Sequence, residues 1–349
     1  MKKLIAYGII GVTLVTLVTL ICSISLFALI NIKINTPINS LGFVKESVEF
    51  TVEKGARAKE VTGALFDRDI IPDSWAINLY AKLAGLTNIK AGRYKLNSVD
   101  TPLTLLKKFN SGEVIQYQIT FVEGWSFRQW LSHFSAIDQF DKTDKRDLLN
   151  SLKLSGIDDA NLEGWFFPDT YYYLSSDTAL DIMLSAHRKM KRVLAQEWAG
   201  RATELPYKTP YEALIMASII EKETGLAEER EEIAGVFVRR LLKGMRLQTD
   251  PTVIYGMGDQ YDGDLRRRDL RQPTPYNTYL IKGLPPTPIA MPSGASISAA
   301  LHPKAGSSLY FVARGDGGHY FSNTLQEHRD AVNKYQLEQR AENYRSAPN

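Results

Sequence analysis

Cysteine is almost missing from this sequence. Cys22 is the only one in 349 residues, so a disulfide framework and a multi-cysteine zinc site are both excluded. Histidine is also sparse: the five histidines are scattered, and none forms a His-Glu-x-x-His pattern. Glycine clusters with nucleotide-binding spacing are lacking as well. The sequence therefore predicts neither a metal nor another cofactor.

A strong charge of either sign is missing too. The 42 basic and 39 acidic residues leave a net charge of +3, and the basic residues are dispersed along the chain. Nucleic-acid binding usually needs a concentrated basic surface, so nucleic acid is not expected as a partner. The Gly-x-Ser-x-Gly and Ser-x-x-Lys patterns of serine catalysis are also absent.

One long apolar run is present, directly after Lys2 and Lys3. Residues 4–32 carry no charge, and about 20 apolar residues suffice to span a bilayer as a helix. The alternative is a cleaved signal peptide, but the run is long and no Ala-x-Ala site follows it. Because the lysines precede the run, we expect the N-terminus in the cytoplasm and the rest outside. The sequence thus predicts a single-pass protein of the cytoplasmic (inner) membrane.

The remainder predicts an α+β protein in three parts after the cytoplasmic tip and anchor of residues 1–34. Residues 35–46 are interpreted as a tether. Residues 47–112 have the order strand, helix, helix, strand, which resembles a LysM domain, a small glycan-binding module; a plain packing domain is the alternative. Residues 113–345 are interpreted as a mixed α+β catalytic domain, rich in loops with Pro, Gly and Tyr.

Two carboxyl groups stand where a buried helix is expected to end. Thr209-Pro210 is a typical helix start, and the apolar residues 213–220 predict a helix buried on all sides. Glu221 and Glu223 follow, although a negative charge opposes the dipole at a helix C-terminus. Burial also disfavours an ionised carboxyl group, so this position suits a general acid. Glu221 lies over small residues and is the better candidate for a cleft; Glu223 points to another side and is expected to orient a neighbour.

Several motifs around this helix resemble the endolytic murein transglycosylases, the MltG or YceG-like family. The motifs follow the family's order over nearly the whole chain: Leu162-Glu163-Gly164-Trp165-Phe166-Phe167-Pro168-Asp169-Thr170, Ala217-Ser218-Ile219-Ile220-Glu221-Lys222-Glu223-Thr224, Arg246-Leu247-Gln248-Thr249-Asp250-Pro251-Thr252-Val253-Ile254-Tyr255-Gly256, Tyr276-Asn277-Thr278-Tyr279, Gly283-Leu284-Pro285-Pro286-Thr287-Pro288-Ile289 and Leu309-Tyr310-Phe311-Val312-Ala313. One small departure is Gly225, directly after the second of these motifs.

The resemblance implies a lytic transglycosylase with Glu221 as its catalytic acid and base. Such an enzyme cleaves the β-1,4 bond between N-acetylmuramic acid and N-acetylglucosamine within nascent peptidoglycan strands, leaves 1,6-anhydro ends and thereby terminates strand elongation. Substrate-binding candidates are Gln248, Asp250, Asn277 and Tyr279, because amides, carboxylates and aromatic faces suit sugars. Each could instead fix a loop.

Two other functions remain open. A hydrolytic muramidase would use a second carboxylate, such as Asp250, to activate water. A membrane-anchored glycan-binding scaffold would use the LysM-like part alone, with Glu221 in a structural role. The expected partners are peptidoglycan strands and the membrane, with cell-wall synthesis proteins as candidate protein partners.

Overall fold

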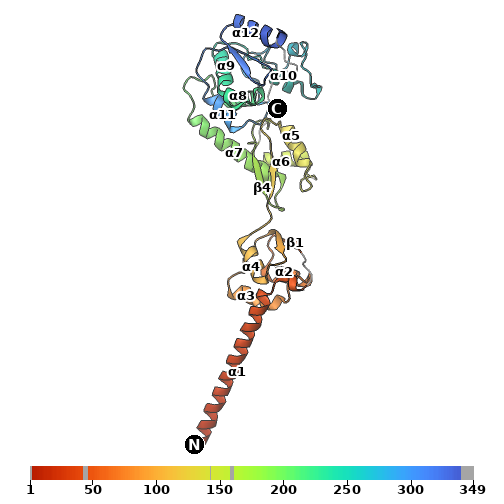
Figure 1. The fold of residues 1–349 in the computed structure, drawn as a ribbon, viewed down its shortest axis with the longest axis vertical. Coiled ribbons are helices and arrows are strands. Elements are labelled where there is room, and N and C mark those ends of the chain that lie inside the picture. Colours follow the sequence, from red (N-terminus) through yellow and green to blue (C-terminus); the bar gives the residue numbers. More distant parts are fainter. Residues whose placement is uncertain (1, 42–45, 142, 158–160, 339–349) are drawn as a thin grey trace. The chain divides into compact units, whose positions relative to one another are not determined.

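The computed structural model describes residues 2–41, 46–141, 143–157 and 161–338 (Figure 1). It confirms a mixed helix-and-strand protein with an apolar helix at its N-terminus. The chain divides into two compact units. The N-terminal unit comprises residues 1–117 with the short segment 172–176, and the C-terminal unit comprises residues 118–171 and 177–349. The predicted end of the catalytic domain at 345 lies outside the described residues.

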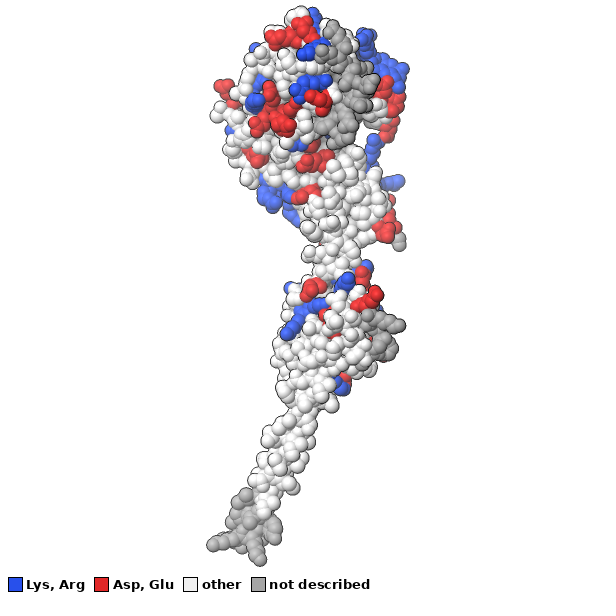
Figure 2. All heavy atoms as spheres, in the orientation of Figure 1, with Lys and Arg blue, Asp and Glu red and all other residues white. Residues whose placement is uncertain are grey.

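The apolar run forms the helix α1, Lys2–Asn35. Its stretch Ile10–Asn35 contains an 18-residue window with a mean hydropathy of 2.5, and only 6% of that window is buried. At about 1.5 Å per residue, this stretch exceeds a hydrocarbon core of about 30 Å. Figure 2 shows no charged side chain on the visible described part of α1 below its junction with the N-terminal unit. By length and composition, α1 is consistent with a single-pass anchor.

The last turns of α1 belong to the core of the N-terminal unit. Ile30 and Ile34 are buried in that core, and Lys33 forms an ion pair with Asp73. The segment that follows includes the 3-10 helix η1, Ile38–Leu41, where Ile38 is fully buried and its N–H donates to Asp100 O at 2.9 Å. Of the expected tether over 35–46, the part up to Asn39 is therefore held against the unit, and residues 42–45 lie outside the described residues.

The rest of the N-terminal unit has the predicted order of strand, helix, helix and strand. Its elements are β1 (Ser47–Val52), α2 (Ala58–Asp67), α3 (Ser74–Leu83), β2 (Gly92–Asn97) and α4 (Pro102–Ser111). β1 and β2 pair antiparallel with Phe50 opposite Tyr94, and both rings are buried. Asp73 caps α3 by accepting from the N–H groups of Trp75 and Ala76. The likeness to a LysM domain stays a prediction.

The C-terminal unit is mainly helical. Its elements are β3 (Tyr117–Thr120, which starts in the N-terminal unit), α5 (Phe127–Ser135), α6 (Lys145–Leu154), β4 (Thr170–Tyr173, which ends in the N-terminal unit), α7 (Ala179–Ala199), α8 (Pro210–Glu223), η2 (Ala227–Glu229), α9 (Arg230–Leu242), α10 (Asp250–Met257), η3 (Gly258–Gln260), η4 (Asp269–Arg271), α11 (Gly294–Leu301), β5 (Tyr310–Ala313), β6 (His319–Ser322), α12 (Leu325–Val332) and η5 (Asn333–Glu338). β3 pairs with β4, and β5 pairs antiparallel with β6.

The core of this unit surrounds α8. Thr209 caps the helix by accepting from the N–H of Glu212, Pro210 occupies the first turn, and every residue from Ala213 to Ile220 is buried. This confirms the predicted all-round burial. Helices α9 and α11 pack against α8, and the three lie side by side (Figure 1). Ser218 reinforces the packing, because its hydroxyl accepts from the N–H of Ile289 at 3.0 Å. The last turn of α8 is thus fixed by a rigid scaffold.

Candidate functional site

Glu221 meets the first turn of α11. Its Oε2 accepts three hydrogen bonds: from the N–H of Ser293 at 2.9 Å, from the Ser293 hydroxyl at 2.5 Å and from the Ser296 hydroxyl at 2.7 Å. Ser293 is also the cap of α11, since its Oγ accepts from the N–H of Ser296. The N-terminus of a helix favours a negative charge, so α11 complements the Glu221 carboxylate in the last turn of α8.

The two oxygens of Glu221 differ in their surroundings. Oε2 is held by the cap of α11, whereas Oε1 accepts no hydrogen bond from any residue that the structure describes. The residue is half-buried, so one side of its carboxyl group remains open. A carboxyl group that is fixed through one oxygen and free at the other can exchange a proton with a bound molecule in a defined direction.

The Ser296 hydroxyl can be tested by the substitution Ser296→Ala. Ser296 is fully buried, and the change removes one of three hydrogen bonds to Oε2 while leaving the cap residue Ser293 in place. Hydrogen bonds to charged groups are worth about 1.5–3 kcal/mol, so we expect kcat to fall by about tenfold with a small decrease in Tm. Ser298→Ala, in the same helix, is the matched control and should leave kcat unchanged. If Ser296→Ala and Ser298→Ala had the same kcat, the Ser296 hydrogen bond would not orient Glu221.

A second carboxyl group lies near Glu221. Glu123 stands in the loop between β3 and α5, and the neighbouring backbone of Gly124 packs against Glu221: a Cβ placed on Gly124 would lie 3.6 Å from Glu221 Cγ. Partial burial raises the pKa of Glu123, the negative charge of Glu221 raises it further, and Arg230 opposes both. No sequence pattern marks Glu123 as a site residue.

A separate polar cluster surrounds Glu223. The carboxyl group accepts from the Thr249 hydroxyl at 2.6 Å, and burial raises its pKa to about 7, with the charge of Asp250 adding to the effect. Asp250 in turn accepts from the Tyr279 hydroxyl at 2.6 Å. Burial raises the pKa of Tyr279, and Asp250 raises it further. Two of the four predicted substrate-binding residues therefore lie together, near Glu223.

The other two candidates are engaged within the protein. Asn277 is fully buried; its Nδ2 donates to the carbonyl oxygens of Leu270 and Gln272, and its Oδ1 accepts from the N–H of Tyr279 at 3.0 Å. Gln248 is exposed at a left-handed φ of 53°, and its Oε1 accepts from Arg240. The amide of Asn277 is therefore used to shape a loop. Substrate contact by Gln248, Asp250, Asn277 and Tyr279 stays a prediction.

Glu163 is another carboxyl group with a role that the sequence alone does not indicate. It is almost fully buried, and burial raises its pKa to about 7. Its oxygens accept from the N–H of Phe127 at 2.8 Å and from the Tyr255 hydroxyl at 3.1 Å. Glu163 thus fastens the start of α5 to α10.

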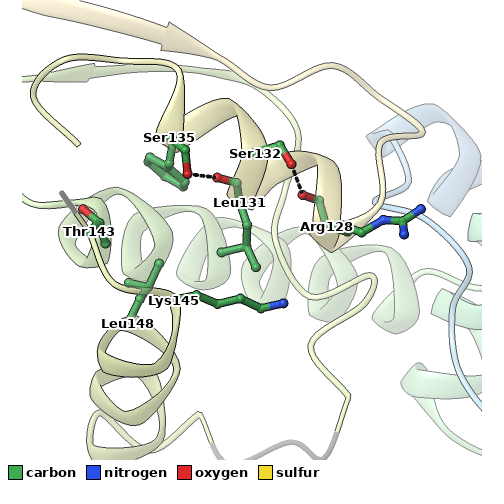
Figure 3. Close-up of a pocket in the computed structure, with 8 residues that line it drawn as sticks. Arg128, Leu131, Ser132, Ser135, Thr143, Lys145 and Leu148 are labelled. Carbon is green, nitrogen blue, oxygen red and sulfur yellow. Dashed lines mark hydrogen bonds between the residues drawn. The ribbon is translucent and has the colours of Figure 1, made fainter. Parts of the chain in front are cut away.

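A surface hollow between α5 and α6 offers no acid. Its lining consists of Arg128, Leu131, Ser132, Phe134, Ser135, Thr143, Lys145 and Leu148. Figure 3 shows that the hydroxyls of Ser132 and Ser135 bond back to carbonyl groups of their own helix. Arg128 forms an ion pair with Asp259. Within the described ranges, no three His, Cys, Asp or Glu side chains come together as a metal site would require.

The sequence comparisons agree with one another. The sequence model of the YceG-like family matches residues 50–334. An endolytic murein transglycosylase of Bacillus subtilis (strain 168) is 33% identical over 309 residues, which cover 83% of this chain and 85% of that protein. An endolytic murein transglycosylase of Streptococcus pneumoniae (serotype 2, strain D39) is 27% identical over 324 residues, covering 81% of this chain but 57% of the longer relative.

A solved structure is also similar. The crystal structure of a YceG-like protein from Listeria monocytogenes superposes with a TM-score of 0.51 at 29% sequence identity. The superposition covers 82% of this chain and 99% of the other.

Proposed function

Because the chain belongs to the YceG-like family, we propose that it is an endolytic murein transglycosylase that cuts peptidoglycan glycan strands with Glu221. The single observation that carries the proposal is the state of the Glu221 carboxyl group, fixed through Oε2 by Ser293 and Ser296 and open at Oε1. The names of the curated relatives supply the substrate class.

The reaction follows from one carboxyl group that gives a proton and takes one back. Protonated Glu221 donates from Oε1 to the glycosidic oxygen, and the bond from that oxygen to C1 of N-acetylmuramic acid breaks. The C6 hydroxyl oxygen of the same sugar then bonds to C1 and closes a 1,6-anhydro ring. Its proton passes to Glu221, which restores the starting state. No water is consumed, because the nucleophile belongs to the substrate.

The rigid mounting of Glu221 supports this use. Oriented proton transfer needs a group held within hydrogen-bond reach of the reacting oxygen, and α8 and α11 fix the carboxyl group from two sides. Cutting nascent strands in this way would terminate their elongation. The anchor α1 would keep the enzyme at the membrane where new strands arise.

The topology of α1 gives the localisation test. We expect a reporter fused after Asn349 to be active only if the reporter functions outside the cytoplasm, because Lys2 and Lys3 precede the apolar span. Paired fusions to a periplasmic phosphatase and to a cytoplasmic fluorescent protein provide the measurement and its control. Activity of the cytoplasmic reporter alone would contradict both the localisation and the access to peptidoglycan.

An enzyme assay tests the proposed function as a whole. Purified full-length protein is incubated with peptidoglycan, and the released glycans are identified by mass. Absence of cleavage by the folded wild-type protein would refute the proposed function.

A further inference from the structure

The loop that follows β3 packs its backbone against Glu221. Gly124 adopts a φ of +74°, a conformation that residues with side chains rarely take, and it brings the backbone flat against the end of α8. A Cβ on this residue would contact both Glu221 Cγ and Lys222 Cδ at 3.6 Å. Glu123 is therefore adjacent in sequence to the residue that touches the proposed acid.

Three hydrogen bonds fasten this loop in place. The N–H of Gly124 donates to Met291 O at 2.9 Å, and the N–H of Met291 donates to Trp125 O at 2.8 Å. Lys222 Nζ donates to Gly124 O at 3.3 Å. Met291 stands two residues before Ser293, so one short segment positions both the Glu221 carboxyl group and the loop that carries Glu123.

The anchoring extends further along the loop. The N–H of Phe127 donates to the buried carboxyl group of Glu163 at 2.8 Å, which fixes the other end of the loop at the start of α5. Glu123 itself is solvent-exposed, although it senses the charge of Glu221. The backbone that follows Glu123 is thus held in place, and the exposed carboxyl group of Glu123, near enough to Glu221 to sense its charge, can face a sugar bound there.

We propose that Glu123 is a second catalytic residue, whose carboxylate faces the muramic acid ring bound against Glu221 and stabilises the positive charge that develops at its C1. This inference rests on the proposed function. Glycosidic cleavage passes through an oxocarbenium-like transition state, and a fixed negative charge lowers the energy of that state more than it affects ground-state binding. Glu123 forms no bond to the substrate and transfers no proton, so the reaction keeps the atom balance given above.

The test is Glu123→Gln in the full-length enzyme, with steady-state kinetics on purified glycan strands. Gln keeps the shape and removes the charge, so we expect kcat to fall by about 10²-fold while KM changes by less than about threefold. Glu123→Asp should recover part of kcat. The Tm should equal that of the wild type, because the side chain is exposed.

Glu53→Gln is the matched control. Glu53 is an exposed carboxyl group that follows β1 and precedes Gly55, whose φ is +85°, so its local setting resembles that of Glu123 in the other unit. The kcat of the Glu53→Gln enzyme should equal that of the wild type.

The outcomes separate this inference from the proposed function. Wild-type kcat in Glu123→Gln would overturn the inference and leave the proposed function standing. So would a rise in KM without a change in kcat, or a loss of activity matched by a loss of Tm. Failure of the wild-type enzyme to cut glycan strands would instead refute the proposed function, and with it the role of Glu123.

Discussion

Glu221→Gln should abolish cleavage, with a loss of at least about 10⁴-fold in kcat and a nearly unchanged Tm. General acid–base help is typically worth about 10²–10⁴-fold, and here one residue serves both proton transfers. The Gln carbonyl oxygen can still accept from Ser293 and Ser296, so the packing of α8 on α11 should persist. The measurement is the release of soluble glycans over time, alongside thermal unfolding of both proteins.

Glu223→Gln is the control for this prediction, because Glu223 lies in the same turn but bonds Thr249. Burial raises the pKa of Glu223 from 4.5 to about 7. The folded protein therefore binds this proton more tightly than the unfolded chain, and the resulting stability is complete below about pH 4.5 and lost as the pH rises through about 7. Glu223→Gln should reduce the decline of Tm between pH 5 and pH 8 and cost less than about tenfold in kcat. Equal catalytic loss at both positions, with normal melting, would show that Glu223 also takes part in the reaction.

The product should be a 1,6-anhydro end. If the C6 hydroxyl attacks C1, each cut leaves a fragment lighter by one water than the hydrolytic product, with no reducing group and no reaction with borohydride. An intramolecular nucleophile reaches effective molarities of about 10⁵–10⁸ M, which favours ring closure over attack by water at the same carbon. Mass spectrometry before and after borohydride treatment distinguishes the 1,6-anhydro product from the hydrolytic product.

The position of the cuts is the second part of this measurement. The relatives are named endolytic, so we expect fragments of many lengths from within strands rather than disaccharides from their ends. The test for reducing ends is necessary because Glu123 lies near Glu221 in the structure. A muramidase would use such a second carboxylate to activate water. Reducible muramic acid ends as the main product would favour that alternative.

The sequence predicted α8 well because local signals agree there. A Thr-Pro start, an unbroken apolar run and two carboxyl groups at the end are all contiguous, and each depends on neighbours within a turn or two. The strand, helix, helix, strand order of the N-terminal unit was predictable for the same reason, since Val48, Phe50 and Val52 alternate with polar residues.

The surroundings of Glu221 could not be predicted in the same way. Ser293 and Ser296 lie 72 and 75 residues away in sequence, and periodicity carries no information on which helix start meets which helix end. A signal was present: Ser293 and Ser296 stand three residues apart at a helix start, the spacing of a capping pair. Glu123 was missed because it follows a strand in a turn, where an exposed carboxyl group is ordinary.

Asn277 shows the opposite case. Its residue type suits a sugar, but the backbone of its loop needed an amide to satisfy two carbonyl oxygens and one N–H group. Composition alone does not distinguish an amide that binds a ligand from an amide that holds a loop, because both roles use the same hydrogen-bonding groups.

The N-terminal helix α1 is not an interchangeable part. Ile30 and Ile34 in the last turns of α1 belong to the core of the N-terminal unit, as does Ile38 in η1, while Lys33 pairs with Asp73. Burial of one isoleucine is worth about 1.5–3 kcal/mol, so a foreign helix grafted at Asn35 could cross the bilayer and still leave the unit above it poorly folded. A successful graft would have to carry isoleucine-sized side chains and a cation at the same positions. The final turns of α1 are therefore constrained by shape complementarity, whereas its earlier turns need only be apolar.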